Sequence, residues 1–168
     1  MFVAGNIVVY PAQGVGRIES IEQKIIEDAS RAFYVVRILS NDITLMVPVS
    51  NARNVGLRAL TTLEHARNIL DGFNDHSPFS RYTGQNWNRR YREYTERLKS
   101  RKLADVANVL HELLLLGRGK ELSFGERRLL EQAMSLVSGE LAIVLDSSEQ
   151  TVRETIQQTF VLSEMQKN

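Results

Sequence analysis

Residues 7–26 read IVVYPAQGVGRIESIEQKII, and this stretch decides how the first third of the chain is interpreted. It consists of short runs rich in β-branched residues, and the turn-forming residues Pro11 and Gly14 separate them. Glycines within such runs, here Gly14 and Gly16, are typical of places where a strand bulges or bends sharply, as small barrels require. The stretch therefore predicts the first two strands of a small all-β domain.

The same pattern continues to about Arg58, with two more β-rich runs joined by a tight turn. Ser40-Asn41-Asp42 has the polar composition of that turn, and the polar residues 28–31 predict the turn before it. Short consecutive strands of this kind favour a small barrel. The predicted strands are Ile7–Tyr10, Val15–Ile26, Phe33–Leu39 and Ile43–Val49.

After Leu60 the apolar residues recur at helical spacing, so we predict a domain boundary there. The expected domains are residues 1–60 and residues 61–168. Thr61 and Glu64 predict a capping box at the start of the first helix. The predicted fold class is α+β with two segregated domains, a small all-β barrel followed by an all-α domain of five helices.

The later helices have their own start and stop signals. Ser123 and Glu126 predict a second capping box, which begins the fourth helix. Gly139 is a tolerated but weakening interruption, and we expect this helix to continue through it. The remaining helices are predicted from about Asn86 to Lys99, from Leu103 to Gly117, and from near Ser148 onward.

Composition limits the class of protein. Apolar residues make up 43% of the 168 residues and charged residues 24%, which is close to globular averages, so each domain can bury a core. The absence of cysteine removes disulfides, thiolate metal sites and cysteine nucleophiles together. No apolar run reaches the length that spans a bilayer, and the N-terminus lacks a secretion signal, so we expect a cytoplasmic protein.

The charge is distributed unevenly, although the net charge is only +1. Residues 1–60 contain 6 basic and 5 acidic residues, residues 81–102 contain 8 and 2, and residues 103–168 contain 6 and 10. One short segment therefore carries the positive charge. Its composition suits a polyanionic partner such as nucleic acid.

The sequence offers no catalytic motif. His65, His76 and His111 are far apart and lack the spacing of metal ligands, so each is expected to be an ordinary surface histidine. Residues 14–16 lack the third glycine, the lysine and the following helix of a phosphate-binding loop. No two acidic residues are arranged as an acid and base couple. We therefore expect no enzymatic activity, no metal and no cofactor.

The most informative segment is residues 86–94, which read NWNRRYREY. On a helix, four apolar or aromatic residues at intervals of four, three and four share one face, while four arginines spread around the other faces. One helix thus offers aromatic groups and cations together. The shared face comprises Trp87, Tyr91, Tyr94 and Leu98, and the arginines are Arg89, Arg90, Arg92 and Arg97.

The residues alone leave two interpretations of this helix open. Arginine guanidinium groups bind phosphate bidentately, so the cluster is suited to clamp a DNA backbone, and Trp87 could act as an apolar wedge against an unstacked base. Alternatively Trp87, Tyr91 and Tyr94 are core residues, and the arginines form a solvated face paired with Glu93 and Glu96.

Several motifs together resemble those of one family. Residues 5–16 (GNIVVYPAQGVG), 33–39 (FYVVRIL) and 55–58 (VGLR) resemble the N-terminal domain of CarD/CdnL transcription regulators. Residues 87–92 (WNRRYR) and 122–128 (LSFGERR) resemble the C-terminal domain of the same family. The motifs follow the family's order over nearly the whole chain and favour the CdnL branch.

The family's N-terminal domain is a Tudor-like or SH3-like barrel, similar to the polymerase-interacting domain of transcription-repair coupling factors, and it docks on the RNA polymerase β subunit. The resemblance implies a docking surface of Met46 and Pro48, with Arg37 or Val36 on the neighbouring strand. Actinobacterial relatives carry arginine at the position of Met46, which implies a more apolar and less salt-dependent contact here. Met46 is alternatively a core residue, because alternation around it does not settle which side chains face outward.

The family's C-terminal domain contacts promoter DNA at the upstream edge of the transcription bubble, where its tryptophan wedges into the minor groove. The resemblance implies that Trp87 is this wedge and that the chain stabilises the open complex. The implied partners are the β subunit, the sigma-containing holoenzyme and fork-junction DNA that is not read for sequence. The implied basic contacts are Arg89, Arg90, Arg92 and Arg127.

Two other functions are carried as alternatives. The first is a polymerase-docked adaptor whose helical domain binds another protein factor rather than DNA. The second is an RNA-binding barrel with a helical appendage. Footprinting of the upstream bubble edge distinguishes the adaptor from the DNA-contacting regulator, and a gel shift with free RNA and residues 1–60 tests the RNA-binding barrel.

Overall fold

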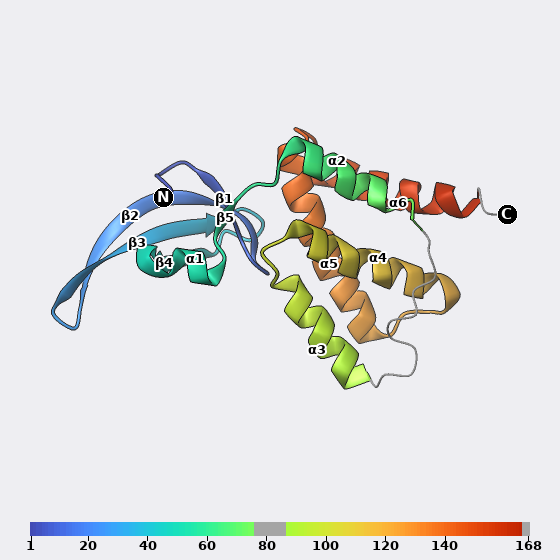
Figure 1. The fold of residues 1–168 in the computed structure, drawn as a ribbon, viewed down its shortest axis with the longest axis horizontal. Helices are drawn as coiled ribbons and strands as arrows, with labels where there is room; N and C mark the ends of the chain where they lie inside the picture. Colours follow the sequence, from blue (N-terminus) through green and yellow to red (C-terminus); the bar gives the residue numbers. More distant parts are fainter. Residues whose placement is uncertain (76–86, 166–168) are drawn as a thin grey trace. The chain divides into compact units, whose positions relative to one another are not determined.

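The computed structural model describes residues 1–75 and 87–165, without the side chains of residues 162–164. The chain divides into two compact units, Met1–Leu60 and Thr61–Asn168 (Figure 1). The first unit is a β-sheet with a short helical segment, and the second consists of helices. Within the described residues, no helix combines the length and the apolar character needed to cross a membrane.

The first unit contains one antiparallel sheet of five strands, in the spatial order β4-β3-β2-β1-β5. All four predicted strands form. The short strand β5 and the helical segment before it are additions to the predicted all-β pattern. The strands are β1 (Ile7–Tyr10), β2 (Gly14–Ile26), β3 (Ala29–Ile38), β4 (Thr44–Pro48) and β5 (Arg58–Ala59), and the helical segment comprises the 3₁₀ turn Val49–Asn51 and α1 (Ala52–Val55).

The turn between β2 and β3 lies earlier than the sequence predicts. Its central residues Glu27 and Asp28 both have positive φ, at 50° and 63°, and Ile26 pairs directly with Ala29. Positive φ at both positions is the geometry of the two-residue turn that matches hairpin twist. The turn predicted at residues 28–31 is therefore wrong, because most of these residues pair with β2. As a result, β2 and β3 continue beyond the rest of the sheet as a two-stranded ribbon (Figure 1).

The core of this unit lies on one side of the sheet and includes a residue of α1. Gly16 is required where β2 meets β3, because a Cβ there would lie 2.7 Å from Val36 Cγ1 and 2.9 Å from the Arg37 carbonyl oxygen. The register shifts between Ile18 and Ser20, beyond the glycines where a bulge was expected. The buried residues of this core are Val8, Ile18, Tyr34, Val36, Ile38, Val47, Ala52 and Leu57.

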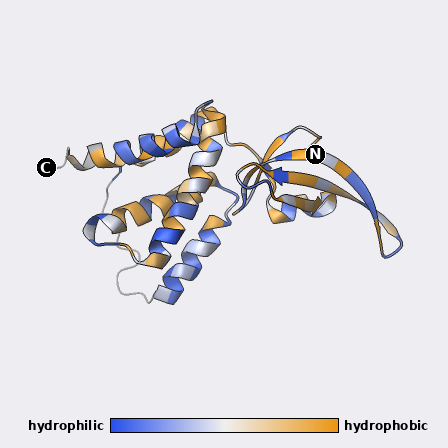
Figure 2. Cartoon of the chain, turned by 180° about the vertical axis from the view of Figure 1, so that it is seen from behind, coloured by the Kyte–Doolittle hydropathy of each residue, from blue (hydrophilic) through white to orange (hydrophobic). Residues whose placement is uncertain are grey.

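The second unit contains the five predicted helices within the described residues. Figure 2 shows apolar and polar residues alternating along these helices, as amphipathic helices around a shared core require. The buried residues of that core include Tyr94, Leu98, Leu110, Leu129 and Met134. The helices are α2 (Leu63–Gly72), α3 (Trp87–Leu98), α4 (Leu103–Gly119), α5 (Phe124–Val144) and α6 (Glu149–Met165).

The cap of α2 is shifted by one residue from its predicted position. The Thr62 hydroxyl, not that of Thr61, accepts a hydrogen bond from the His65 backbone amide. The Thr61 amide instead donates to Glu140 Oε2 at 2.8 Å, so this residue is held outside the helix by α5. The predicted box of Thr61 and Glu64 is therefore wrong, because a contact distant in sequence fixes Thr61.

The cap of α5 forms as predicted. Ser123 Oγ accepts from the Glu126 backbone amide, and Glu126 Oε1 accepts from the Ser123 backbone amide, which completes a reciprocal capping box. The helix then runs through Gly139 to Val144, as expected. The first turn of α5, which this cap begins, packs against Trp87 through Gly125.

Candidate functional site

The surface predicted to dock on polymerase lies on β3 and β4, and the structure assigns the direction of its side chains. Tyr34, Val36 and Ile38 are buried in the core, so the alternating residues of β3 face the opposite side. The register places Val35 on that side, directly opposite Met46. The prediction for Val36 is therefore corrected: its side chain is fully buried, and Val35 takes its place on the exposed side.

Arg37, Met46 and Pro48 share this exposed side. Met46 is 39% exposed, so it does not fill the core as the alternative interpretation proposed. Arg37 is exposed and forms an ion pair with Glu19, with 3.2 Å between Nε and Oε1. β4 is an edge strand, so one of its backbone edges has no neighbouring strand in the sheet. We call Phe33, Val35, Arg37, Met46 and Pro48 the outer face.

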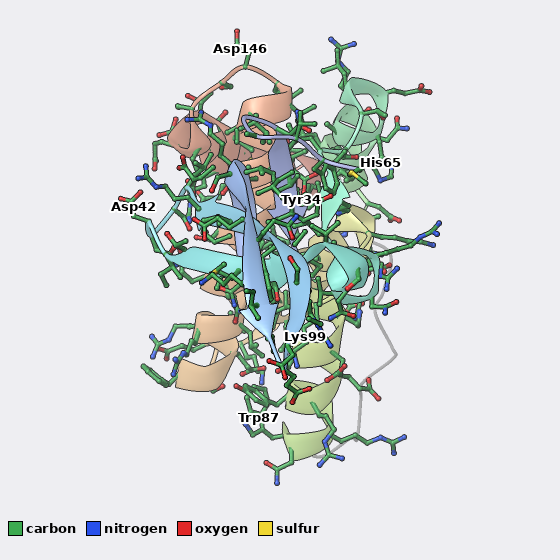
Figure 3. All side chains as sticks on the ribbon, turned by 90° about the vertical axis from the view of Figure 1, so that its left-hand side faces the viewer. Tyr34, Asp42, His65, Trp87, Lys99 and Asp146 are labelled. Atoms are coloured by element: carbon green, nitrogen blue, oxygen red, sulfur yellow. The ribbon has the colours of Figure 1, made fainter. Side chains whose placement is uncertain are left out.

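Trp87 begins α3 and is half-buried (Figure 3). Its ring packs on the first turn of α5, because a Cβ added at Gly125 would lie 2.7 Å from Trp87 Cζ2. Arg90 Cζ lies 5.5 Å from the centroid of the Trp87 ring, and the ring centroid of Tyr91 lies 5.6 Å away. Contacts from two helices therefore fix the orientation of the indole while part of it stays accessible.

The buried stripe of α3 passes through Arg90 rather than Tyr91. Tyr94 and Leu98 are buried as predicted, but Tyr91 is 46% exposed, so its prediction as a core residue is wrong. The observed stripe has intervals of three, four and four residues, which a helix accommodates as well as the predicted ones. Arg90 Nε is buried, and the guanidinium reaches the ring of Trp87.

The arginines of α3 differ in their contacts. Arg97 donates from Nη1 and Nη2 to the carboxylate of Glu112 on α4, at 2.7 and 2.9 Å, and is largely buried. Arg89 is 69% exposed, and its Nε lies 3.8 Å from Glu93. Arg92 is exposed and makes no ion pair with any described residue. Arg97 thus has a structural role, whereas Arg89 and Arg92 leave positive charge at the surface.

The alternative interpretation of α3, in which its arginines form a solvated face paired with Glu93 and Glu96, holds only in part. The Arg89–Glu93 pair is long and exposed, and surface pairs of this kind contribute little. Glu96, the other expected partner, lies 3.6 Å from Lys99 instead. The long Arg89–Glu93 pair therefore offsets only part of the positive charge of Arg89, Arg90 and Arg92.

The first turn of α5 adds two groups that the motif-based prediction missed. Successive helical residues are about 100° apart, so Arg128 lies about 60° around the helix from Gly125, which contacts Trp87. Arg127, the predicted contact, is exposed but lies about 160° from Gly125. Phe124 lies about 100° from Gly125 on the same side as Arg128, and it is 74% exposed. An aromatic residue beside basic residues at a helix start was the signal available for finding them.

The carboxyl group of Glu126 stabilises this turn. It is 2% exposed and accepts hydrogen bonds from the Ser123 amide at 3.0 Å and from Lys120 Nζ at 3.4 Å. Burial raises the pKa of Glu126, but the hydrogen bonds from Ser123 and the charge of Lys120 outweigh burial and hold the pKa below its ordinary value. Glu126 is therefore ionised at neutral pH and fixes the turn against which Trp87 packs.

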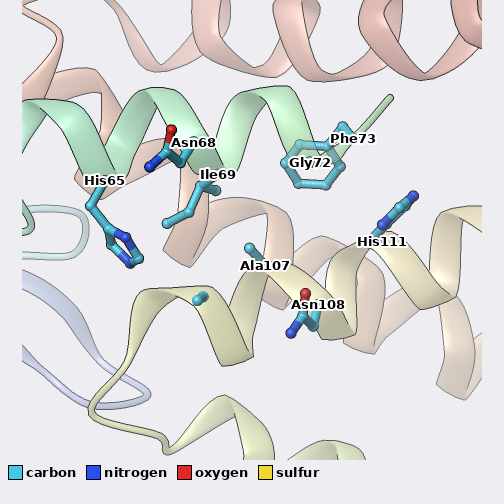
Figure 4. Close-up of a pocket in the computed structure, with 9 residues that line it drawn as sticks. His65, Asn68, Ile69, Gly72, Phe73, Ala107, Asn108 and His111 are labelled. Carbon is cyan, nitrogen blue, oxygen red and sulfur yellow. The ribbon is translucent and has the colours of Figure 1, made fainter. Parts of the chain in front are cut away.

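Two of the three histidines, His65 and His111, lie within the described residues, and His76 lies outside them. His65 is exposed, as expected. His111 is half-buried rather than at the surface, with its ring 5.6 Å from that of Phe73 and 6.1 Å from that of Phe160. His65 and His111 line a pocket of about 200 Å³ between α2 and α4 (Figure 4). Among residues 1–75 and 87–165, no three acidic or histidine side chains are placed to hold a metal ion.

Comparisons with known proteins assign each unit to a family. Residues 2–61 match the family model of the CarD-like/TRCF RID domain, and residues 76–157 match that of the CarD C-terminal domain. YdeB of Bacillus subtilis (strain 168), whose name marks it as a candidate transcription factor, is 28% identical over 153 residues, which cover 91% of this chain and 98% of YdeB. The solved structure of CdnLNt from Myxoccoccus xanthus is 41% identical, covers 35% of this chain and 83% of that chain, and has a TM-score of 0.31. The chain belongs to the CarD/CdnL family of transcription factors, and its N-terminal domain is of the RNA polymerase-interacting class.

Proposed function

We propose that this chain binds the RNA polymerase β subunit through the outer face of its sheet and stabilises the promoter open complex through its helical unit. In this proposal Trp87 and the nearby arginines contact DNA at the upstream edge of the bubble. The observation that carries it is the group at the start of α3. There an indole held by Gly125 and Arg90 lies beside exposed Arg89 and Arg92, and Arg92 forms no ion pair with any described residue.

The fixed orientation of Trp87 suits a wedge. An indole that is ordered before binding loses little conformational freedom when it meets an unstacked base. Because α5 covers the ring edge that includes Cζ2, the wedge uses the remaining accessible part of the ring. Apolar side chains insert where base steps are already unstacked or easily unstacked, so Trp87 favours melted DNA over intact duplex.

The arginines supply affinity that is largely independent of sequence. Guanidinium groups bind phosphate bidentately, and each neutralised phosphate releases counterions. Arg89, Arg92 and Arg128 are exposed for such contacts, and Arg90 holds the indole. Because so few phosphates are contacted, we expect weak binding to DNA alone, and this binding should weaken with salt by a slope of only about 0.9 per phosphate contacted.

The outer face suits a protein partner. It combines the apolar side chains of Val35, Met46 and Pro48 with the cation of Arg37, and it includes the edge strand β4. An edge strand can accept a strand of the partner through backbone hydrogen bonds, while alternate side chains contact the partner surface. The β subunit is the partner that the family resemblance implies.

Because the chain binds polymerase and DNA at the same time, even a weak DNA contact can stabilise the open complex. Docking on polymerase raises the local concentration of the helical unit at the promoter. A group that binds melted DNA better than duplex shifts the equilibrium toward the open complex by its differential affinity. Each 1.4 kcal/mol of that difference changes the equilibrium about tenfold.

Footprinting of the upstream bubble edge tests the proposal against the adaptor alternative. Polymerase–promoter complexes with the wild-type chain should show altered reactivity there, and Arg92→Ala should weaken the change. Arg67→Ala is the matched control, because it removes an exposed arginine from α2 instead. A polymerase-bound chain that leaves this edge of the bubble unaltered would favour the adaptor.

A further inference from the structure

The pocket between α2 and α4 has no part in the function proposed above. None of the residues that line it belongs to the outer face or to the group around Trp87. It has a volume of about 200 Å³, and the two helices form its opposite sides (Figure 4). Its lining therefore needs an account of its own.

Small residues leave this space unfilled. Gly72 lines the pocket on α2, and a Cβ added there would meet nothing within 4 Å. On α4 the lining includes Ala104 and Ala107, which are one helical turn apart and so face the same side. Each of these positions carries the smallest side chain that its helix could use, so the two helices do not close on each other.

Two asparagines, one from each helix, supply polar groups to the pocket. Asn68 on α2 and Asn108 on α4 are exposed, and neither side chain forms a hydrogen bond with any described residue. Each amide offers two donors and one acceptor. Asparagine is a poor residue for the interior of a helix, so the helices gain nothing from either side chain. Residues that work against their own element are expected at functional sites.

The chemistry of the lining excludes strongly charged ligands. Among the described residues that line the pocket, none is an aspartate, a glutamate, a lysine or an arginine. A phosphate or a carboxylate would therefore leave water without gaining an opposite charge. Ile69 and Ala107 are buried and give the pocket an apolar floor, while the imidazole of His111 beside Phe73 adds an aromatic wall.

We propose that this pocket binds a single uncharged heteroaromatic base, of the kind that a nucleoside or an unstacked strand of nucleic acid carries. The amides of Asn68 and Asn108 match the donors and acceptors along the edge of such a ring, as asparagine does with adenine. The apolar floor and the aromatic wall match its faces. The volume is below the range of about 300–1,000 Å³ that drug-sized ligands need, so it suits one base rather than a dinucleotide.

The test measures binding to the full ¹⁵N-labelled chain by NMR, without polymerase. The probes are adenosine, guanosine, cytidine and thymidine, a short single-stranded DNA, and inorganic phosphate as the charged comparison. We expect at least one nucleoside or the DNA strand to shift the resonances of the pocket residues, and phosphate to leave them unchanged. Shifts confined to nucleosides identify a free small molecule as the source of the base, and shifts confined to the strand identify nucleic acid.

Two variants test the pocket itself. Asn108→Leu removes one amide and should weaken binding by about three- to tenfold, the effect of losing one hydrogen bond. Gln132→Leu is the matched control, because it removes an exposed amide from α5 instead and should bind as the wild type does. Ala104→Leu should abolish binding by filling the space while both amides remain. The unfolding midpoint of Asn108→Leu in urea should not fall, since leucine favours a helix more than asparagine does.

The inference is overturned if no nucleoside and no single strand shifts the pocket resonances at millimolar concentration. It is also overturned if inorganic phosphate shifts them equally, or if Asn108→Leu and Ala104→Leu bind as Gln132→Leu does. Because polymerase is absent from this test, each of these results leaves the proposed action on the open complex standing. Loss of that action would in turn leave the pocket inference intact.

Discussion

The two halves of α3 use arginine in different ways. In the second half, Arg97 makes two short hydrogen bonds to the buried carboxylate of Glu112, close to Tyr94 and Leu98 in sequence. In the first half, Arg89 and Arg92 are exposed; Arg89 forms a long ion pair with Glu93, and Arg92 forms none with any described residue. The same residue type therefore supports the fold at one end of the helix and presents charge at the other. Burial and partners, rather than the number of arginines, identify the candidate DNA contacts.

The largest expected effect comes from breaking the structural half. Glu112→Ala leaves Arg97 without its carboxylate partner in a largely buried position, and we expect it to lower the free energy of unfolding by about 2–4 kcal/mol. Arg92→Ala, in the other half, should change it by less than about 0.5 kcal/mol. Urea unfolding of both variants checks this contrast. Similar losses in the two variants would contradict the division of α3 into two halves.

A smaller effect is expected from displacing Trp87 with Gly125→Ala. The new methyl group would lie 2.7 Å from Trp87 Cζ2, so the indole or the first turn of α5 must move. We expect a loss of about 1–2 kcal/mol in unfolding free energy. The fluorescence of Trp87, the only tryptophan in the sequence, should shift to longer wavelength as its ring becomes more exposed.

Gly139→Ala is the matched control for this substitution. It lies in the same helix, and its added Cβ would meet nothing within 4 Å. Because alanine favours the helix more than glycine does, this variant should gain up to about 1 kcal/mol. If both variants changed stability and fluorescence in the same direction, the packing of Trp87 on Gly125 would not be the cause.

The smallest expected effect is the pH dependence of the stability that Glu126 contributes in the capping box of α5. The folded-state pKa of Glu126 is lowered, so its charge contributes stability that is present above the ordinary pKa of a glutamate and is lost as the pH falls through the folded-state pKa. Glu126→Gln keeps the acceptor and removes the charge. At pH 7 this variant should be less stable than the wild type by about 0.3–1 kcal/mol. The difference should shrink below about pH 5, and a difference that grew on acidification would contradict this sign.

Local signals predicted much of this fold because they depend on neighbouring residues. The capping box of Ser123 and Glu126 satisfies amide groups three residues apart, so the sequence contains both partners. The passage of α5 through Gly139 follows from the apolar spacing on both sides of the glycine. The failed cap at Thr61 shows the limit, because Glu140, far along the chain, takes its amide.

The candidate site depends more on distant contacts, and its prediction was less complete. Near Met46 the strand is apolar at consecutive positions, so only pairing with β3 reveals that Val36 faces the core and Val35 faces outward. On α3, stripes through Tyr91 or through Arg90 are equally regular, and packing against other helices selects Arg90. The contact between Trp87 and Gly125 joins two helices that no sequence pattern connects.

The measurement that tests the central claim most directly is the lifetime of the open complex on a ribosomal RNA promoter after heparin challenge. Purified polymerase is compared without the chain, with the wild-type chain and with Trp87→Ala, after unfolding and polymerase binding show that the variant is folded and docked. The account predicts that the wild type lengthens the lifetime by about tenfold or more and that Trp87→Ala loses most of this gain. Equal lifetimes with the two docked proteins would contradict the account and would make Trp87 a packing residue.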